Sequence, residues 1–118
     1  MKLAIVGSRD FKNLQVVRDL VNSLPNTFII VSGGAHGVDI VAEQTAYFAG
    51  LEVKIFYPEY IKYSENMKWK APLDRNTKIV EFCDKLVAFW NGTSSGTLDI
   101  IRKSKQVSKL EEVFTDES

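Results

Sequence analysis

A glycine-rich stretch lies between a strand-like apolar segment and a helix-like one. It is VSGGAHGVD, from Val31 to Asp39, and it holds three glycines. Glycine lets the backbone approach an anion closely, and the first N–H groups of a helix point at an anion together with the positive end of the helix dipole. Two further turns share this pattern, one at Gly7 to Arg9 and one at Asn91 to Thr97. Together the three turns predict a phosphate site.

The side chains around these turns suit the rest of a phosphate ligand. The guanidinium of Arg9 is able to bind phosphate or carboxylate in a bidentate way. His36 lies inside the glycine-rich turn, so we expect it to contact a ligand. It is the only histidine and has no companion for metal binding, so we expect no metal site. Trp90 could stack on a base. The expected ligand-binding residues are Gly7, Ser8, Arg9, Gly33, Gly34, Ala35, His36, Gly37, Arg75, Asn76, Trp90, Gly92, Ser94, Gly96 and Thr97.

Several of these residues also suit structural roles, and the sequence leaves both roles open. Ser8 and Thr97 are of the residue types that cap helices as well as donate to phosphate. Asn76 is as well suited to capping a helix as to reading a base or a ribose. Asp39 lies at the start of a helix, where a carboxylate complements the dipole, and we expect it to stabilise the loop rather than touch the ligand.

Composition restricts the fold and the partners. The 118 residues suit a single domain over 1–118, with a frayed tail expected over 114–118. Fifteen basic and fifteen acidic residues cancel, so nucleic-acid binding needs a local basic patch. No apolar run approaches the ~20 residues of a membrane helix, and we expect a cytoplasmic protein. Neither GxGxxG nor GxxxxGK occurs, which disfavours ordinary dinucleotide binding and Walker-type nucleotide hydrolysis.

Strand-like and amphipathic helical segments alternate along the chain. Strands are predicted over 1–6, 28–31, 52–56, 85–90 and, at an edge, 110–114, and helices over 13–24, 38–49, 73–83 and 97–105. This alternation predicts an α/β fold, a Rossmann-like three-layer α/β/α sandwich with a mainly parallel five-stranded sheet. With the strand order 3-2-1-4-5, the turns after the first and fourth strands flank one crevice at the switch point.

One connection, residues 57–72, is long and has neither helical nor strand periodicity. Connections of this length are often lids or binding loops, and a surface excursion pinned by its own aromatic side chains is an equal alternative. Its basic and aromatic residues form a strip that could stack the bases of a single strand. They are Lys62, Lys68, Lys70, Tyr60, Tyr63 and Trp69.

The motifs and their order resemble the SLOG superfamily. The matching segments are IVGSRDF, VSGGAHGVDIVAEQTAYFAG, RNTKIV and VAFWNGTSSGT, and they span most of the chain up to Lys105. This Rossmann-like group includes the DprA (Smf) and LOG families, and the chain is most similar to its small single-domain YspA- and YpsA-like members. The resemblance implies a nucleotide or nucleotide-derived ligand and a homodimer, and DprA-like members also bind single-stranded DNA.

The segment after the fourth strand departs from the LOG enzymes. Those enzymes carry PGGxGTxxE, whereas this chain reads NGTSSGTLDI, with Asn91 in place of the proline and Ile100 at the catalytic glutamate. Asp99 is one residue early. A shift of one residue turns a helical side chain by ~100°, so Asp99 replaces that glutamate only after rearrangement.

Three functions follow from these observations. The first is a sensor or carrier module that binds a nucleotide or a nucleotide-derived phosphate in the crevice. The second is a hydrolase of nucleotide N-glycosidic bonds, with Asp99 or a loop glutamate, Glu59 or Glu65, stabilising positive charge on the ribose. The third is a single-stranded DNA-binding module of DprA type. We expect a nucleotide-like ligand rather than a fixed cofactor, and no membrane partner.

Overall fold

A parallel sheet forms the centre of the computed structural model, which describes residues 1–116. The described strands are β1 (Lys2–Gly7), β2 (Ile29–Ser32), β3 (Glu52–Ile55), β4 (Lys85–Trp90) and β5 (Leu110–Thr115). They lie in the order β3-β2-β1-β4-β5, and all neighbouring strands pair in parallel. The predicted strand order is therefore confirmed.

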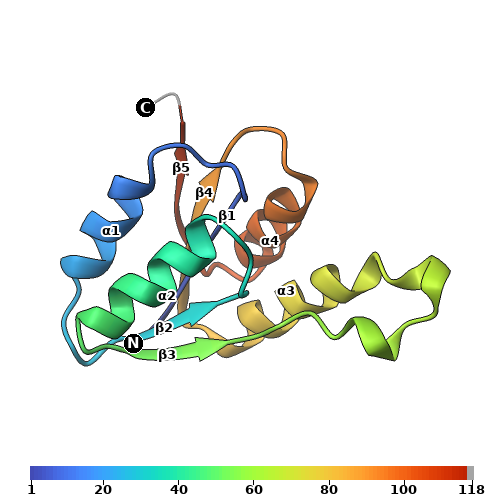
Figure 1. Cartoon of the computed structure of the whole chain (residues 1–118), viewed down its shortest axis with the longest axis horizontal. Coiled ribbons are helices and arrows are strands. Elements are labelled where there is room, and N and C mark those ends of the chain that lie inside the picture. The colour runs from blue at the N-terminus through green and yellow to red at the C-terminus, as the bar shows by residue number, and fades with distance from the viewer. Residues whose placement is uncertain (117–118) are drawn as a thin grey trace.

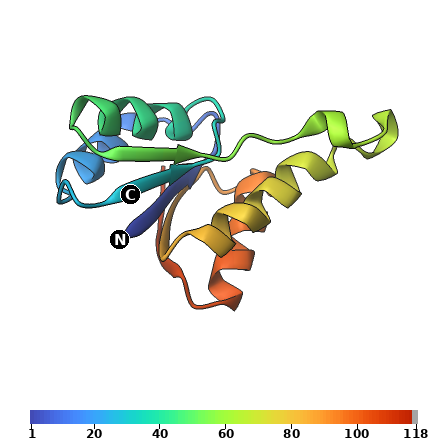
Figure 2. The same ribbon diagram turned by 90° about the horizontal axis from the view of Figure 1, so that it is seen from below.

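Helices cover both faces of this sheet, with α1 and α2 on one face and α3 and α4 on the other (Figures 1 and 2). They are α1 (Leu14–Asn22), α2 (Val38–Phe48), α3 (Lys70–Phe82) and α4 (Ser95–Gln106). Side chains alternate across a strand, so Ile5 of β1 enters the core under α1 and α2, while Val6 enters the core under α3 and α4. This arrangement confirms the predicted Rossmann-like three-layer sandwich. No helix within residues 1–116 is long and apolar enough to cross a bilayer.

The long connection after β3 extends away from the sheet together with the first turns of α3 (Figures 1 and 2). We call residues 57–74 the arm. It contains two short 3-10 helices, η1 (Tyr60–Lys62) and η2 (Glu65–Met67). The helix α3 begins at Lys70 rather than at the predicted residue 73. Pro72 lies inside its first turn, which is tolerated because the first N–H groups of a helix have no partner within it.

The C-terminal strand also holds residues that were expected to fray. Phe114 of β5 stacks on Phe89 with the ring centroids 4.9 Å apart. The carboxylate of Asp116 accepts hydrogen bonds from the N–H groups of Lys12, at 3.0 Å, and Asn13, at 3.3 Å. Residues 114–116 are thus tied to β4 and to the start of α1, which corrects that expectation. Residues 117–118 lie outside the described part.

Candidate functional site

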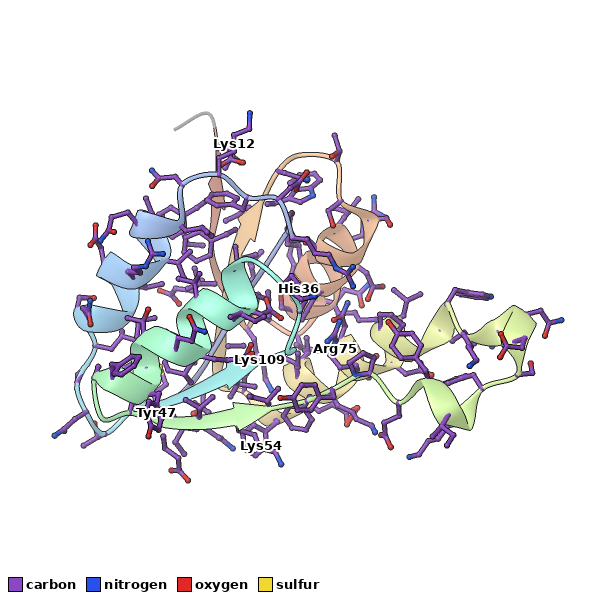
Figure 3. The ribbon with its side chains drawn as sticks, in the orientation of Figure 1. Lys12, His36, Tyr47, Lys54, Arg75 and Lys109 are labelled. Atoms are coloured by element: carbon purple, nitrogen blue, oxygen red, sulfur yellow. The ribbon has the colours of Figure 1, made fainter. Side chains whose placement is uncertain are left out.

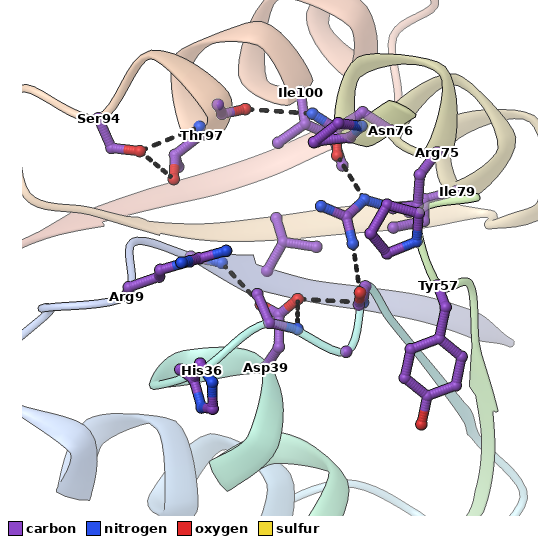
Figure 4. Close-up of a pocket in the computed structure, with 18 of the residues that line it drawn as sticks. Arg9, His36, Asp39, Tyr57, Arg75, Asn76, Ile79, Ser94, Thr97 and Ile100 are labelled. Atoms are coloured by element: carbon purple, nitrogen blue, oxygen red, sulfur yellow. Dashed lines mark hydrogen bonds between the residues drawn. The ribbon is translucent and has the colours of Figure 1, made fainter. Parts of the chain in front are cut away.

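A cavity of about 760 Å³ lies where the carboxyl ends of the parallel strands meet (Figure 4). The turns after β1 and β2, the first turns of α3 and α4, and the base of the arm all contribute to its walls. Figure 3 shows His36 and Arg75 at this edge, away from Tyr47 near the other end of α2. The predicted site residues that line the cavity are Gly7, Arg9, Gly33, Gly34, Ala35, His36, Arg75, Asn76, Ser94, Gly96 and Thr97.

Four predicted residues are not among those that line the cavity, namely Ser8, Gly37, Trp90 and Gly92. The hydroxyl of Ser8 is buried, lies 3.2 Å from the hydroxyl of Thr97 and accepts the N–H of Asn91. The indole of Trp90 donates to the carbonyl of Ser94 at 3.0 Å and so closes the turn after β4. Gly37 and Gly92 have φ of +82° and +88°, which favour glycine. All four residues shape the turns.

Asp39 occupies the centre of the glycine-rich turns. Its buried carboxylate accepts hydrogen bonds from the N–H groups of Gly7 at 3.2 Å, Gly33 at 3.1 Å and Ala35 at 3.3 Å. These donors, which the sequence assigned to phosphate, are therefore bound to a carboxylate of the chain itself. Burial raises the pKa of Asp39 to about 7, against the opposing effects of the Ala35 N–H and the Arg75 charge.

Two arginines face the cavity from different elements (Figure 4). Arg75 of α3 donates to the carbonyl of Gly33 and, through Nε, to the side chain of Asn76 at 3.1 Å. Partial burial lowers the pKa of Arg75, and the positive charge of Arg9 lowers it further. Arg9 follows β1 and is exposed. Within residues 1–116, neither arginine forms a salt bridge, although the charge of Asp39 acts on Arg75 and opposes the lowering of its pKa.

The start of α4 forms the wall beside these arginines. Ser94 is the N-cap, and its hydroxyl accepts the N–H of Thr97 at 3.4 Å. Gly96 also lines the cavity, and a Cβ added there would meet open space. The positive end of the α4 dipole is therefore presented to the cavity. Asn76 is less available, because its amide nitrogen donates to the carbonyl of Gly96 and to Asp99.

The acidic residues proposed for hydrolysis lie away from the cavity walls. Asp99 accepts from Asn76 at 3.1 Å and forms a salt bridge with Lys103 at 2.9 Å. Glu59 pairs with Lys62 and Lys78, and Glu65 pairs with Lys68. The hydrolase hypothesis thus loses the carboxylates on which it depended.

Aromatic and proline side chains form the remaining wall, and most of them were not among the predicted site residues. Tyr57, Pro58 and Tyr60 enter from the base of the arm, and Pro72 from the first turn of α3. The ring of Tyr57 packs on Gly34, where an added Cβ would lie 2.6 Å from it. One signal was present in the sequence, since Tyr57 follows the third strand at the same edge as the glycine turns.

The strip of basic and aromatic residues on the arm is neutralised by its own carboxylates. Lys62 pairs with Glu59 at 2.8 Å, and Lys68 pairs with Glu65 at 3.1 Å. Lys70 lies over the ring of Trp69, 5.7 Å from its centroid. The arm carries three lysines and three carboxylates and therefore has no net charge. Ile61, in η1, is 94% exposed.

Two solved structures are similar to this chain over almost its whole length. DNA processing protein A (DprA) from Streptococcus pneumoniae superposes with a TM-score of 0.77 and 20% identity, covering 97% of this chain and 49% of that one. A DprA structure from Helicobacter pylori, described for its single-stranded DNA binding mode, gives a TM-score of 0.76 and 22% identity over 98% of this chain and 64% of that one. The chain thus spans about half to two thirds of the proteins it matches, and these similarities show the fold.

Comparison at the sequence level gives the family. No curated protein sequence matched the chain. The family model described as DNA recombination-mediator protein A matches residues 1–59, which contain the turns after β1 and β2 together with Arg9, His36 and Asp39. This match confirms the resemblance to the SLOG superfamily through its DprA (Smf) branch. Because it spans half of the 118 residues, the chain belongs to the DNA recombination-mediator protein A family.

Proposed function

We propose that this chain binds single-stranded DNA at the cavity, with a backbone phosphate held between Arg9 and Arg75. The convergence of these two guanidinium groups, without a carboxylate salt bridge within residues 1–116, is the observation that carries the proposal. Burial lowers the pKa of Arg75 and the charge of Arg9 adds a smaller effect in the same direction, so an anion placed between the two groups stabilises the charged form of Arg75. Guanidinium groups suit this task because their planar donors match phosphate oxygens.

Two further features support a nucleotide unit of a strand as the ligand. The N-terminus of α4 offers its dipole to the same phosphate. The exposed rings of Tyr57 and Tyr60, on the opposite wall, provide aromatic faces for a base. The similarity to the Helicobacter pylori protein, whose described property is single-stranded DNA binding, favours a strand over other anions.

A free nucleotide is the second candidate ligand. The lysines Lys62 and Lys68 of the arm are already paired with carboxylates, which leaves few cations to follow a long strand. The cavity volume of about 760 Å³ also falls in the range typical of small-molecule sites. Competition between an oligonucleotide and a mononucleotide therefore separates the two candidates.

The first test measures the fluorescence anisotropy of a labelled oligothymidylate with the intact chain and with Arg9→Ala. The variant should lose about 5- to 150-fold in affinity, because one charge-assisted contact contributes on the order of 1 to 3 kcal/mol. Arg18→Ala is the matched control, since Arg18 lies on α1 and bonds only Gln15 in the described structure. It should bind as the unchanged protein does.

Three results have different meanings. Equal losses in Arg9→Ala and Arg18→Ala would remove Arg9 from the site and leave only a general charge effect. No binding of the oligonucleotide, combined with thermal stabilisation by thymidine monophosphate, would favour the free nucleotide. Binding that thymidine monophosphate does not displace would favour the strand.

A further inference from the structure

Asp39 is a buried acid at the edge of a cavity that we propose to be an anion site. The residue is 4% exposed and lines the cavity. Its carboxylate accepts hydrogen bonds from three N–H groups. A carboxylate in this position supplies negative charge next to any anion that enters. The proposed function assigns no role to the Asp39 carboxylate, yet the protonation state of this carboxylate changes the electrostatic environment of a phosphate in the cavity.

The charges that face Asp39 come from all the elements packed around it. Arg75 of α3 stabilises its ionised form, and Glu43, one turn along α2, disfavours that form. Glu43 is itself partly buried, accepts a hydrogen bond from the hydroxyl of Ser32, and has a pKa raised by burial. The other charged or titratable groups around the cavity are Arg9, Asp10, His36 and Tyr60.

We propose that Asp39 sets the affinity of the cavity for anions by taking up a proton when an anion binds. For its ligand this inference rests on the proposed function. The step is the uptake of one proton from the buffered solvent by the carboxylate, so that the negative charge of Asp39 is neutralised when the negative charge of the ligand enters. Asp39 acts here as a positioning and charge-setting residue.

The geometry makes this exchange favourable near neutral pH. Like charges repel strongly in a buried site, because less water screens them. Burial already raises the pKa of Asp39 to about 7, so protonating it at neutral pH costs little. A neutral carboxyl keeps a carbonyl oxygen for the N–H groups of Gly33 and Ala35, and the turn retains an acceptor.

The first measurement follows oligothymidylate affinity between about pH 6 and pH 9, where internal phosphodiesters keep a constant charge. For the unchanged chain, affinity should fall by up to about tenfold per pH unit above the pKa of Asp39, as expected when one proton is taken up. Asp39→Asn should remove this dependence. Glu43→Gln should keep the dependence but move it to lower pH, because the charge of Glu43 raises the pKa of Asp39. His36→Gln isolates any contribution of the imidazole that lines the same cavity.

A second measurement uses only the unchanged chain and sulfate, so it depends neither on the folding of a variant nor on DNA binding. Carbon-13 NMR should show the Asp39 carboxyl of the unchanged chain titrating near pH 7, and sulfate, an anion of constant charge, should move this titration to higher pH. Titration near pH 4, the ordinary range of aspartate, would overturn the inference. So would a titration that sulfate leaves unchanged.

The two proposals fail in distinguishable ways. DNA binding with the same affinity at every pH would reject the role of Asp39 and leave the proposed function intact. If the unchanged chain does not bind DNA but its Asp39 titration depends on sulfate, DNA is rejected as the ligand and the proposed proton uptake is retained. A pH dependence that persists in Asp39→Asn and disappears in His36→Gln would assign the effect to the imidazole and reject Asp39.

Discussion

The carboxylate of Asp39 receives the N–H groups of Gly7, Gly33 and Ala35, so the glycine-rich turns hold an anion that the chain itself supplies. A loop role for Asp39 was predictable from its position at a helix start. The sequence did not predict that these N–H groups would be occupied by Asp39 and thus unavailable to an external phosphate, because a sequence pattern does not give the direction of a side chain. In the proposed function, Arg9 and Arg75 are therefore the main anion-binding groups, while the glycines keep the backbone close enough to enclose Asp39.

The raised pKa of Asp39 predicts how stability depends on pH. The pKa is about 7 in the folded chain against 3.8 for an ordinary aspartate, so between these values the unfolded chain has released a proton that the folded chain retains. The free energy of unfolding should therefore fall as pH rises from about 4 to about 7, by up to about 1.4 kcal/mol per pH unit, and change little above that range. Urea unfolding at a series of pH values measures this slope.

Asp39→Asn provides the comparison for that slope. Asparagine keeps an acceptor oxygen and does not titrate, so the contribution of Asp39 to the pH dependence should disappear. Glu43 has a raised pKa too and contributes a slope of the same sign, which Glu43→Gln removes separately. Identical slopes in the unchanged chain and in Asp39→Asn would show that Asp39 ionises normally.

At the scale of elements, the two helix N-termini near the cavity differ. The turn before α2 is bound to Asp39, whereas the first turn of α4 carries no acidic side chain and lines the cavity at Ser94 and Gly96. The pattern of glycines predicted both turns as anion sites and did not indicate which of them would be free to bind an external anion. The difference arises because the side chain of Asp39, at the start of α2, folds back onto the preceding loop and accepts the N–H groups of Gly33 and Ala35.

Gly96→Ala tests the role of α4. Alanine is the better helix former by up to about 1 kcal/mol, and a Cβ there meets no atom within 4 Å, so stability should rise. The same methyl group projects from a residue that lines the cavity and should weaken DNA binding several-fold. Thermal unfolding and anisotropy measure the two effects. Ser95→Ala is the control, because Ser95 precedes Gly96 but does not line the cavity, and it should leave DNA binding unchanged. Unchanged DNA binding by Gly96→Ala would place the phosphate away from α4.

Most elements were predictable because their apolar spacing is strong, as for Val17 and Val21 in α1 or the buried run of β1. The elements that differ are those fixed by distant contacts. The arm has no periodicity of its own, and it is tied back to α3 by pairs that are distant in the sequence, such as Glu59 with Lys78. The C-terminal end is held by Asp116 at the start of α1, more than a hundred positions away, which no local pattern reveals.

At the scale of the whole molecule, charge is the main constraint on binding a polyanion. The chain has zero net charge, and the lysines Lys62 and Lys68 of the arm are engaged by carboxylates of the arm. A protein of this kind gains little from long-range attraction to DNA. Under the proposed function, its affinity for DNA has to come from the two guanidinium groups and the aromatic side chains of the cavity.

This balance predicts a weak dependence of DNA binding on salt. Each phosphate neutralised on a single strand contributes about −0.7 to the slope of log K against log salt, so two arginine contacts give a slope of about −1.4. Anisotropy titrations with oligothymidylate at several salt concentrations measure it. Arg9→Ala should reduce the slope by about 0.7, while Arg18→Ala should leave it unchanged. A slope of about −3 or steeper would mean that four or more cations contact the strand, so that cations beyond Arg9 and Arg75, such as arm lysines released from Glu59 and Glu65, take part in binding.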